Sequence, residues 1–239
     1  MEKRISGHTG LLALIGSPVG HSGSPAMYNY SFEKLGLDYA YVAFDIKEDK
    51  VKDAIAAMKT FNMRGCNVTM PDKVEAAKYM DELSPAAQII GAVNTIVNKD
   101  GRLEGHNTDF SGFMYMLKKH NISVKGKKCV VLGDGGASKA VVAVLKKMEA
   151  KEVVIVDIIK TASAITYEEC FAKHTDAEFI ANTSPVGMYP NCDASPVDLT
   201  RFPECEAVVD VIYNPLETKL VAQARELGMT GVNGLEMLV

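Results

Sequence analysis

A strand, a glycine-rich loop and a helix follow one another in the second half of the chain, and this succession constrains the fold more than any other feature. Residues 128–132 are apolar and partly β-branched, which predicts a buried strand. The loop Gly133-Asp134-Gly135-Gly136-Ala137-Ser138 follows, a helix is expected over 135–148, and a second strand over 153–156. A strand–helix–strand unit of about 28 residues is typical of half a nucleotide-binding fold. The sequence therefore predicts a Rossmann-like domain in this region.

Three glycines in this loop have the positions that a bound pyrophosphate requires. Gly133, Gly135 and Gly136 allow a tight turn and a close approach of the backbone to phosphate oxygens. Ala137 and Ser138 are small enough to let the helix pack on the strand, and the helix N-terminus offers free N–H groups. Glycines also occur in strand-to-helix turns for structural reasons alone, and the loop by itself leaves that alternative open.

Two aspartates bear on which nucleotide this loop would take. Asp134 places a carboxylate in the loop, where it would repel phosphates unless it points away. Asp157 closes the next strand, where an acidic residue usually accepts hydrogen bonds from the adenosine ribose and excludes a 2′-phosphate. Only Lys160 follows it closely, and no Arg does, so NAD is favoured over NADP. A plain turn residue at the end of a strand is the alternative for Asp157.

The first 120 residues alternate between strand-like and helix-like segments. This alternation predicts an α/β domain with a mostly parallel sheet. The expected strands are 11–15, 39–46, 65–68, 93–97 and 103–106, and the expected helices are 24–36, 48–60, 71–80, 85–90 and 109–120.

A polar stretch with two turn signals, residues 121–127, predicts the domain boundary. The chain is therefore divided into an N-terminal domain, 1–120, and a C-terminal domain, 121–239. In the latter, further strands are expected over 178–181 and 207–211, and a helix over 217–227.

Three polar segments interrupt the apolar runs of the first 110 residues: 67–73, 91–95 and 107–109. Lys73 lies in the first turn of its expected helix, where the helix dipole mildly disfavours a positive charge. A lysine in this position therefore suggests a function. With Asp109 it offers a pair suited to proton transfer at an alcohol or ketone. A solvated helix Lys and a helix-capping Asp are the structural alternatives.

Neutral polar side chains accompany this pair. Asn67 and Thr69 follow a strand, where α/β folds line their clefts, and Asn94 lies within an apolar segment and needs a partner if buried. Ser22 and Ser24 lie two residues apart in a loop, from which both hydroxyls could bind a carboxylate; each is also a common turn or cap residue.

Composition excludes several other classes of protein. The net charge of −4 and the pI of about 5.8 argue against a nucleic-acid partner. The apolar stretch 11–15 is too short for a signal peptide or a membrane span. The five cysteines form no C-x-x-C pair, so we expect reduced thiols in a cytoplasmic protein. The histidines are scattered, so no metal site is expected.

Taken together, these segments resemble the shikimate dehydrogenase family, including its quinate/shikimate branch. The resemblance runs from Ile15 to Val239. The matching segments are 21–25, 67–73, 91–96, 107–109, 133–138, Asn182-Thr183-Ser184-Pro185-Val186-Gly187-Met188, Val211-Ile212-Tyr213-Asn214-Pro215 and 234–239. The resemblance implies a substrate domain and a Rossmann-like domain with a cleft between them. It also implies reversible NAD(P)-dependent hydride transfer between shikimate and 3-dehydroshikimate, within chorismate and aromatic amino acid biosynthesis, with quinate as a second candidate substrate.

Roles for individual residues follow from the same resemblance. Lys73 and Asp109 look like the catalytic pair. Substrate binding is implied for Ser22, Ser24, Asn67, Thr69, Asn94 and Tyr213. Cofactor binding is implied for Gly133, Gly135, Gly136, Ala137, Asp157, Thr183, Met188 and Gly234.

The chain departs from the family pattern at three places. Family members commonly have Ala where Asp134 stands. They usually carry an Asn-Arg-Thr-like segment that binds a 2′-phosphate, where this chain has Val156 to Lys160, and the helix that follows is expected to be shortened. They also continue past the position of Val239 with a substrate-binding Gln and a helix, so residues are expected to be missing there and after Asp157.

Two functional hypotheses remain at the level of sequence. The first is an NAD(P)-dependent dehydrogenase acting on a small-molecule substrate, as a monomer or a homodimer. The second is a non-catalytic sensor that binds shikimate or quinate without turnover. The retained Lys73 and Asp109 favour the enzyme, because a sensor has no need of proton-transfer groups.

Overall fold

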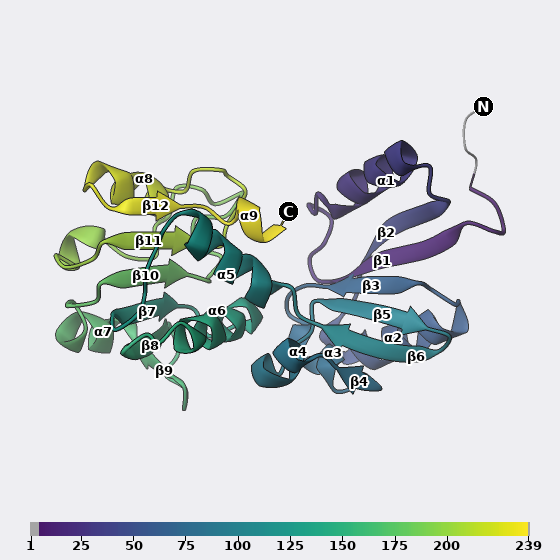
Figure 1. The fold of residues 1–239 in the computed structure, drawn as a ribbon, viewed down its shortest axis with the longest axis horizontal. Helices are drawn as coiled ribbons and strands as arrows, with labels where there is room; N and C mark the ends of the chain where they lie inside the picture. Colours follow the sequence, from purple (N-terminus) through teal and green to yellow (C-terminus); the bar gives the residue numbers. More distant parts are fainter. Residues whose placement is uncertain (1–4, 239) are drawn as a thin grey trace. The chain divides into compact units, whose positions relative to one another are not determined.

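The computed structural model describes residues 5–238 and divides the chain into two compact α/β units. The first unit ends at Asn107 and the second begins at Thr108 (Figure 1). Each unit contains one six-stranded sheet with helices packed on it. The predicted fold class, two α/β domains with mostly parallel sheets, is confirmed.

The sheet of the first unit has the strand order β2-β1-β3-β5-β6-β4. Its strands are β1 (Gly10–Gly16), β2 (Tyr39–Asp45), β3 (Gly65–Val68), β4 (Glu82–Leu83), β5 (Thr95–Lys99) and β6 (Arg102–His106). Strands β2, β1 and β3 are mutually parallel, β5 is antiparallel to β3 and β6, and β4 is parallel to β6. Ile15 pairs with Val68, so the loops that follow β1 and β3 leave from the same edge of the sheet.

The helices of the first unit are α1 (Ser24–Leu35), α2 (Val51–Thr60), α3 (Lys73–Ala77) and α4 (Pro85–Ile90), with a short 3-10 helix η1 (Glu48–Lys50) before α2. Helix α2 places Val51, Ile55 and Met58 in a core shared with β1, β3 and β5. Helices α1 and α4 end at Gly36 and Gly91, both in the left-handed conformation that glycine adopts at low cost.

Two predicted elements of the first unit are wrong in their bounds. The strand expected from 93 begins only at Thr95, because Val93 N donates to the carbonyl of Lys73 and Asn94 N donates to that of His106. Residues 92–94 therefore connect neighbouring elements. The helix expected over 71–80 is confined to Lys73–Ala77.

The sheet of the second unit is entirely parallel, in the order β12-β11-β10-β7-β8-β9. Its strands are β7 (Lys128–Leu132), β8 (Glu152–Asp157), β9 (Ala164–Thr166), β10 (Phe179–Asn182), β11 (Ala207–Asp210) and β12 (Thr230–Val232). This is the doubly wound order of dinucleotide-binding folds, and it reverses between β7 and β10. Ligands of such sheets bind beyond the carboxyl ends of the strands at that reversal.

The helices of the second unit are α5 (Asp109–Lys119), α6 (Gly136–Lys147), α7 (Tyr167–Lys173), α8 (Lys219–Glu226) and α9 (Leu235–Leu238), with a short 3-10 helix η2 (Leu199–Arg201). None of the helices in residues 5–238 combines the length and the apolarity needed to cross a bilayer.

The two compact units meet before α5, between Asn107 and Thr108, whereas the sequence placed the boundary after α5, at 120. Phe113, Met116 and Leu117 are completely buried in a core with residues of α6, β7 and β10. Helix α9, which comes later in the second unit, also packs on α5. Lys119 forms a 2.6 Å ion pair with Glu236, and Gly112 lies against Met237. The polar stretch 121–127 is a loop inside the second unit.

The connection between β8 and β9 consists only of residues 158–163 and contains no helix. Parallel neighbours are usually joined by a dozen or more residues that include a helix. Thr161 N donates to the carbonyl of Ala164 and closes the chain into a tight return. The shortening expected after Asp157 is therefore present in the fold, and β9, which the sequence did not predict, becomes the edge strand.

Candidate functional site

The predicted nucleotide loop lies at the reversal of the second sheet. Gly133 follows β7 with φ of +101°, a conformation that residues with a Cβ rarely adopt. A Cβ at this position would lie 3.0 Å from Thr183 Oγ1 and 3.1 Å from Ser184 N. Thr183 follows β10 and donates to the carbonyl of Leu132 at 2.7 Å, which holds the two strand ends together.

The N-terminus of α6 faces out of this loop without a side-chain cap. Gly135 is the N-cap residue and no side chain accepts a hydrogen bond from the first turn. The first N–H groups of a helix have no hydrogen-bond partner within the helix. The uncapped N-terminus of α6, a helix of 12 residues, is therefore suited to binding an anion. The predicted loop and helix are confirmed as structure, with the helix starting at Gly136 instead of Gly135.

Asp157 ends β8 and is half-buried. Asp134 N donates to its Oδ2 at 2.8 Å, and Ile159 N donates to its Oδ1 at 3.3 Å. Each carboxylate oxygen has a second lone pair, so these bonds leave capacity for a further donor such as a ribose hydroxyl.

Three other residues predicted to bind ligand lie in loops after the carboxyl ends of β10, β11 and β12. Met188 is half-buried, Tyr213 is exposed, and Gly234 is buried. Any side chain at Gly234 would collide with the carbonyl of Val211, and Gly234 N donates to the carbonyl of Ile212. The structure thus brings these loops to the same edge of the sheet as the glycine loop.

A buried polar network that the sequence did not reveal holds these loops in place. Asp210 is fully buried at the end of β11 and accepts hydrogen bonds from Asn182 Nδ2 at 3.0 Å, Ile212 N at 3.1 Å and Thr218 Oγ1 at 2.7 Å. Burial raises the pKa of the Asp210 carboxyl to about 6, and the hydrogen bonds oppose that shift only in part. Asn182 Oδ1 in turn accepts from the Ser184 hydroxyl at 2.7 Å. In the sequence, only the position of Asp210 near the end of an expected strand indicated this role.

In the first unit, Thr69 and Lys73 flank the loop that follows β3. Thr69 N donates to the carbonyl of Ile15 at 2.9 Å, and a side chain at Gly16 would collide with the Thr69 methyl group. Lys73 is half-buried at the start of α3, and its carbonyl accepts from Val93 N at 2.9 Å. Lys73 is thereby fixed beside the segment that carries Asn94.

Asn67 is held within the sheet by side chains of β2 and β5. Its Oδ1 accepts from the Tyr41 hydroxyl at 2.8 Å, and its Nδ2 donates to Thr95 Oγ1 at 3.2 Å. Tyr41 is buried and stacks on Tyr28 with ring centroids 4.4 Å apart. Burial raises the pKa of Tyr41, and a hydrogen bond from Ser24 partly offsets that rise. Tyr41 was not predicted as a site residue; its place on an alternating strand was the only hint.

The two predicted carboxylate-binding serines lie at the start of α1. Ser24 N donates to Ser22 Oγ at 3.2 Å, so the two side chains belong to one local turn. Asp45, at the end of β2, accepts from the Ser17 hydroxyl at 2.7 Å and from Val19 N at 3.4 Å. These bonds anchor the start of the loop that leads to both serines. Gly23, and not Ser24, is the N-cap residue of α1.

Asp109 belongs to the second unit, as the first residue of α5. Thr108 is the N-cap residue, as predicted, but its side chain makes no capping hydrogen bond. Asn107, the last residue of the first unit, is buried and donates to the carbonyl of Ala92 at 3.1 Å.

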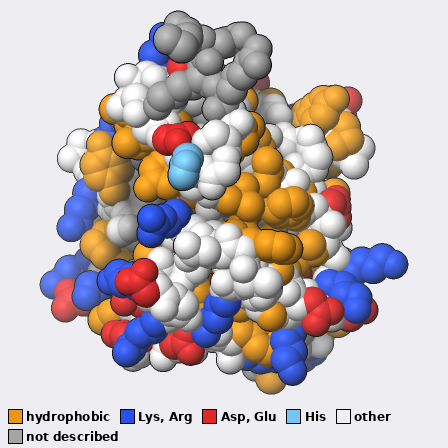
Figure 2. All heavy atoms as spheres, turned by 90° about the vertical axis from the view of Figure 1, so that its right-hand side faces the viewer, with side chains coloured by type: hydrophobic (Ala, Val, Ile, Leu, Met, Phe, Trp, Pro, Cys, Tyr) orange, Lys and Arg blue, Asp and Glu red, His pale blue; other side chains and the backbone are white. Residues whose placement is uncertain are grey.

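Charge and metal ligands single out no competing site. Within the described residues, no group of three or more His, Cys, Asp or Glu side chains could hold a metal ion. All five cysteines are free thiols. The face of the molecule shown in Figure 2 carries acidic and basic side chains interspersed among hydrophobic ones, with no basic stripe.

A doubly wound parallel sheet with a glycine loop at its reversal, joined to a second α/β unit, defines a dinucleotide-binding protein of the dehydrogenase class.

Comparison with known proteins identifies the family within this class. Residues 14–96 match the family model described as "Shikimate dehydrogenase substrate binding domain". The chain is 40% identical to a shikimate dehydrogenase (NADP(+)) of Alkaliphilus metalliredigens, over 100% of this chain and 91% of the relative. The chain therefore belongs to the shikimate dehydrogenase family.

Solved structures agree with this assignment. Shikimate dehydrogenase 1 of Peptoclostridium difficile aligns with a TM-score of 0.87 and 37% identity, over 96% of this chain and 87% of that one. A shikimate 5-dehydrogenase of Listeria monocytogenes, in complex with shikimate and NAD, aligns with a TM-score of 0.81 and 36% identity, over 100% and 90% of the two chains. These relatives are enzymes and favour the dehydrogenase hypothesis over the sensor.

Proposed function

We propose that this protein is a shikimate dehydrogenase, which interconverts shikimate and 3-dehydroshikimate by hydride transfer with a nicotinamide dinucleotide. The observation that carries the proposal is the 40% identity to a shikimate dehydrogenase (NADP(+)) across the whole of this chain. The glycine loop at the reversal of the second sheet supports the proposal, because dinucleotides bind at that point in doubly wound folds. In this proposal the first unit binds the substrate and the second binds the dinucleotide.

Proton transfer is assigned to Lys73, supported by Asp109. Oxidation of a ring alcohol releases a proton from the hydroxyl, and a lysine held in place by its own backbone can exchange that proton. Lys73 has such a fixed backbone, through the 2.9 Å bond from Val93 N. Asp109, half-buried in the first turn of α5, orients the reacting group and supports it electrostatically.

Substrate recognition is assigned to neutral polar groups of the first unit together with Tyr213. Ser22 and Ser24 hold the carboxylate, while Thr69 and Asn94 bind ring hydroxyls. The restraint of these groups by backbone hydrogen bonds supports this role, because a preorganised site loses less entropy on binding. Asn67 is assigned a supporting position, since its side chain is engaged by Tyr41 and Thr95. Tyr213 is assigned a place beside the substrate.

Dinucleotide binding is assigned to the glycine loop and the strand ends around it. The pyrophosphate is assigned to Gly133, Gly135, Gly136 and Ala137. The loop is tight, since a Cβ at Gly133 would crowd Thr183, and the N-terminus of α6 has no side-chain cap. A bound nicotinamide supplies the hydride acceptor. Met188 and the backbone of Gly234 are assigned to the nicotinamide, and Thr183 to a place near the cofactor.

We assign NAD as the preferred cofactor. Asp157 presents a carboxylate at the end of β8, and no Arg occurs in the connection 158–163 to bind a 2′-phosphate. The Alkaliphilus relative is named for NADP(+), whereas the Listeria structure contains NAD, so both cofactors occur in the family.

The experiment that tests the function is initial-rate absorbance at 340 nm with four pairings of substrate and cofactor. Shikimate or quinate is combined with NAD or NADP, and the folded state is verified by circular dichroism. Turnover of shikimate with NAD is expected to be fastest. Turnover with NADP alone would remove Asp157 as a selector, and no turnover in any pairing would refute the enzymatic function.

We also propose a cytoplasmic location, which the five free thiols support. The protein acts as a monomer or a homodimer in this proposal, and light scattering on the eluting peak of a gel-filtration column distinguishes the two. No nucleic-acid or membrane partner is proposed.

A further inference from the structure

The side chain of Asp134 extends from the nucleotide loop to the connection between β8 and β9, where two hydroxyl groups hold it. Thr161 donates to Asp134 Oδ2 at 2.9 Å, and Ser163 donates to the same oxygen at 2.7 Å. The two hydroxyl oxygens lie 3.1 Å apart. An anionic oxygen of the protein itself therefore occupies the point on which both donors converge.

Backbone hydrogen bonds fix the direction in which Thr161 donates. Thr161 Oγ1 accepts from Ser163 N at 3.2 Å and from Ala164 N at 2.9 Å. Because a hydroxyl has two lone pairs and one hydrogen, these bonds leave its hydrogen for an acceptor such as Asp134. The short connection therefore presents two hydroxyl groups that donate to one anionic oxygen, here Asp134 Oδ2.

This hydroxyl pair lies next to the residue that faces the adenosine ribose in folds of this kind. That residue ends the second strand of the nucleotide-binding half, here Asp157 at the end of β8. Asp134 N donates to Asp157 Oδ2 at 2.8 Å, which joins the two aspartates directly. A 2′-phosphate on the ribose would therefore approach both carboxylates.

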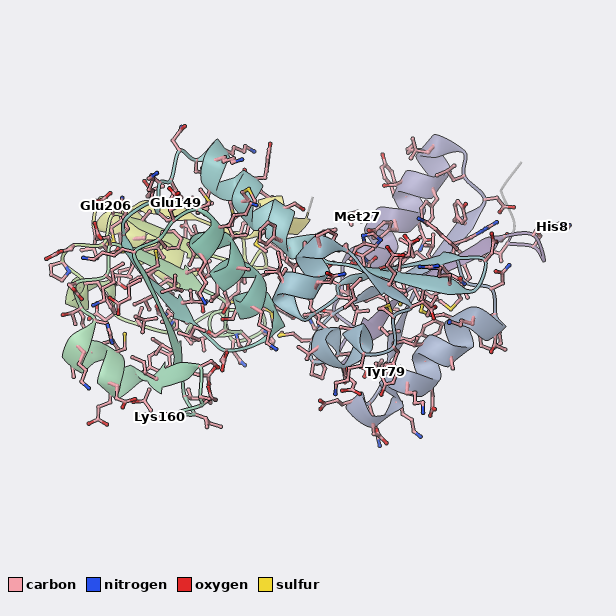
Figure 3. The ribbon with its side chains drawn as sticks, turned by 60° about the horizontal axis from the view of Figure 1, so that its bottom comes forward. His8, Met27, Tyr79, Glu149, Lys160 and Glu206 are labelled. Carbon is pink, nitrogen blue, oxygen red and sulfur yellow. The ribbon has the colours of Figure 1, made fainter. Side chains whose placement is uncertain are left out.

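The only basic residue of the connection does not offset these charges. Lys160, labelled in Figure 3, forms a 2.5 Å ion pair with Glu169 of α7. Asp134, Asp157 and the Lys160–Glu169 pair are charged groups of this region. Their sum is negative, which opposes a second anion.

We propose that Asp134 is a specificity-determining residue: its carboxylate fills the hydroxyl pair of Thr161 and Ser163 as a built-in anion and so excludes a nucleotide 2′-phosphate. The inference rests on the proposed function, in which this loop binds a dinucleotide. It extends the role of Asp157, because replacing Asp157 alone leaves the hydroxyl pair occupied. Replacing Asp134 vacates the pair for a phosphate oxygen.

The test measures nucleotide binding by calorimetry without substrate or turnover. The matched ligands are ADP-ribose and 2′-phospho-ADP-ribose, which differ only in the 2′-phosphate. The wild type is expected to prefer ADP-ribose. Asp134→Ala is expected to shift the ratio of the two dissociation constants by about tenfold toward the phosphorylated ligand, because the vacated hydroxyl pair can donate to a phosphate oxygen and one opposing negative charge is removed.

Two further variants separate this explanation from a general effect of charge. The double variant Asp134→Ala with Ser163→Ala is expected to lose most of the gain, because half of the hydroxyl pair is gone. Asp193→Ala removes a fully exposed carboxylate of the same unit and is expected to leave the ratio unchanged. Asp134→Asn keeps an acceptor oxygen without the charge, so a smaller gain is expected, and this variant carries the test if Asp134→Ala fails to fold.

Several results would overturn the proposal. They are an unchanged ratio in both Asp134 variants, a full gain that survives the Ser163 change, a wild type that prefers the phosphorylated ligand, or a wild type that binds neither ligand. An absence of shikimate turnover would refute the proposed function while leaving these binding ratios measurable, so the two failures are distinguishable.

Discussion

Replacement of Asp210 by Asn is expected to remove a pH dependence from the stability of the second unit. Burial raises the pKa of this carboxyl to about 6 in the folded protein, whereas in the unfolded chain it titrates near its ordinary value of 3.8. The folded state therefore holds the proton more tightly. Its stabilising contribution is complete below about pH 4, declines as the pH rises, and is lost above about pH 6.

The size of this effect follows from the difference between the two pKa values. Each unit of difference corresponds to about 1.4 kcal/mol, so the wild type loses on the order of 3 kcal/mol from this group between pH 4 and pH 7. An amide at this position has no such proton to lose, so the stability of the variant should change less over this range. Relative to the wild type, Asp210→Asn is therefore expected to gain on the order of 3 kcal/mol between pH 4 and pH 7.

The hydrogen bonds of the variant add an offset that does not depend on pH. The amide oxygen can still accept from Asn182 and Ile212, and the Thr218 hydroxyl can turn to accept from the new amide nitrogen. Thr218 Oγ1 already accepts from Val221 N at 3.3 Å, so its hydrogen would lose its acceptor at a cost of about 1–3 kcal/mol. The slope with pH, and not the stability at one pH, therefore carries the prediction.

The assay is urea unfolding of both proteins at half-unit steps from pH 4 to pH 8. The chain has no tryptophan, so far-ultraviolet circular dichroism is the suitable probe. All other titrating groups are shared and cancel in the difference between the two proteins. Parallel stability curves would show that Asp210 does not titrate in this range and would refute the reasoning.

Three further substitutions test the site and the fold. Lys73→Ala is expected to lower shikimate turnover by a factor of about 10² to 10⁴ with a smaller change in KM, while Lys78→Ala, an exposed lysine of the same segment, should leave both unchanged. Gly133→Ala should weaken nucleotide binding and lower the melting temperature more than Gly126→Ala, because both glycines have positive φ but only Gly133 has close neighbours; equal effects would contradict this explanation. Thr166→Ala removes the capping box of α7 and should cost about 1 kcal/mol in urea unfolding, whereas Thr166→Ser should restore most of that loss.

Features that depend on short stretches of sequence were predictable. The strand, glycine loop and helix around Gly133 follow from local apolar periodicity and from the conformational freedom of glycine, and the structure confirms them to within a residue or two. The glycine caps of α1 and α4 follow in the same way. Asp157 was placed correctly at the end of its strand.

Features that depend on distant contacts were not predictable. The assignment of α5 to the second unit results from burial of Phe113 and Leu117 against helices and strands that come later in the chain. The three-residue strand β9 exists because it pairs with β8, and its own sequence is too short to indicate it. Tyr41 and Asp210 acquire their positions from partners 26 and 28 residues away, which no local pattern identifies.

The packing of α9 on α5 affects when the second unit can complete its folding during synthesis. Among the described residues these are the first and last helices of the second unit, and Lys119 and His120 both pair with Glu236. Domains generally fold as units as they leave the ribosome, so the first unit can fold while the second is still being made. The second unit, in contrast, keeps one face of its leading helix open until α9 has been translated, so α5 stays partly uncovered up to that point.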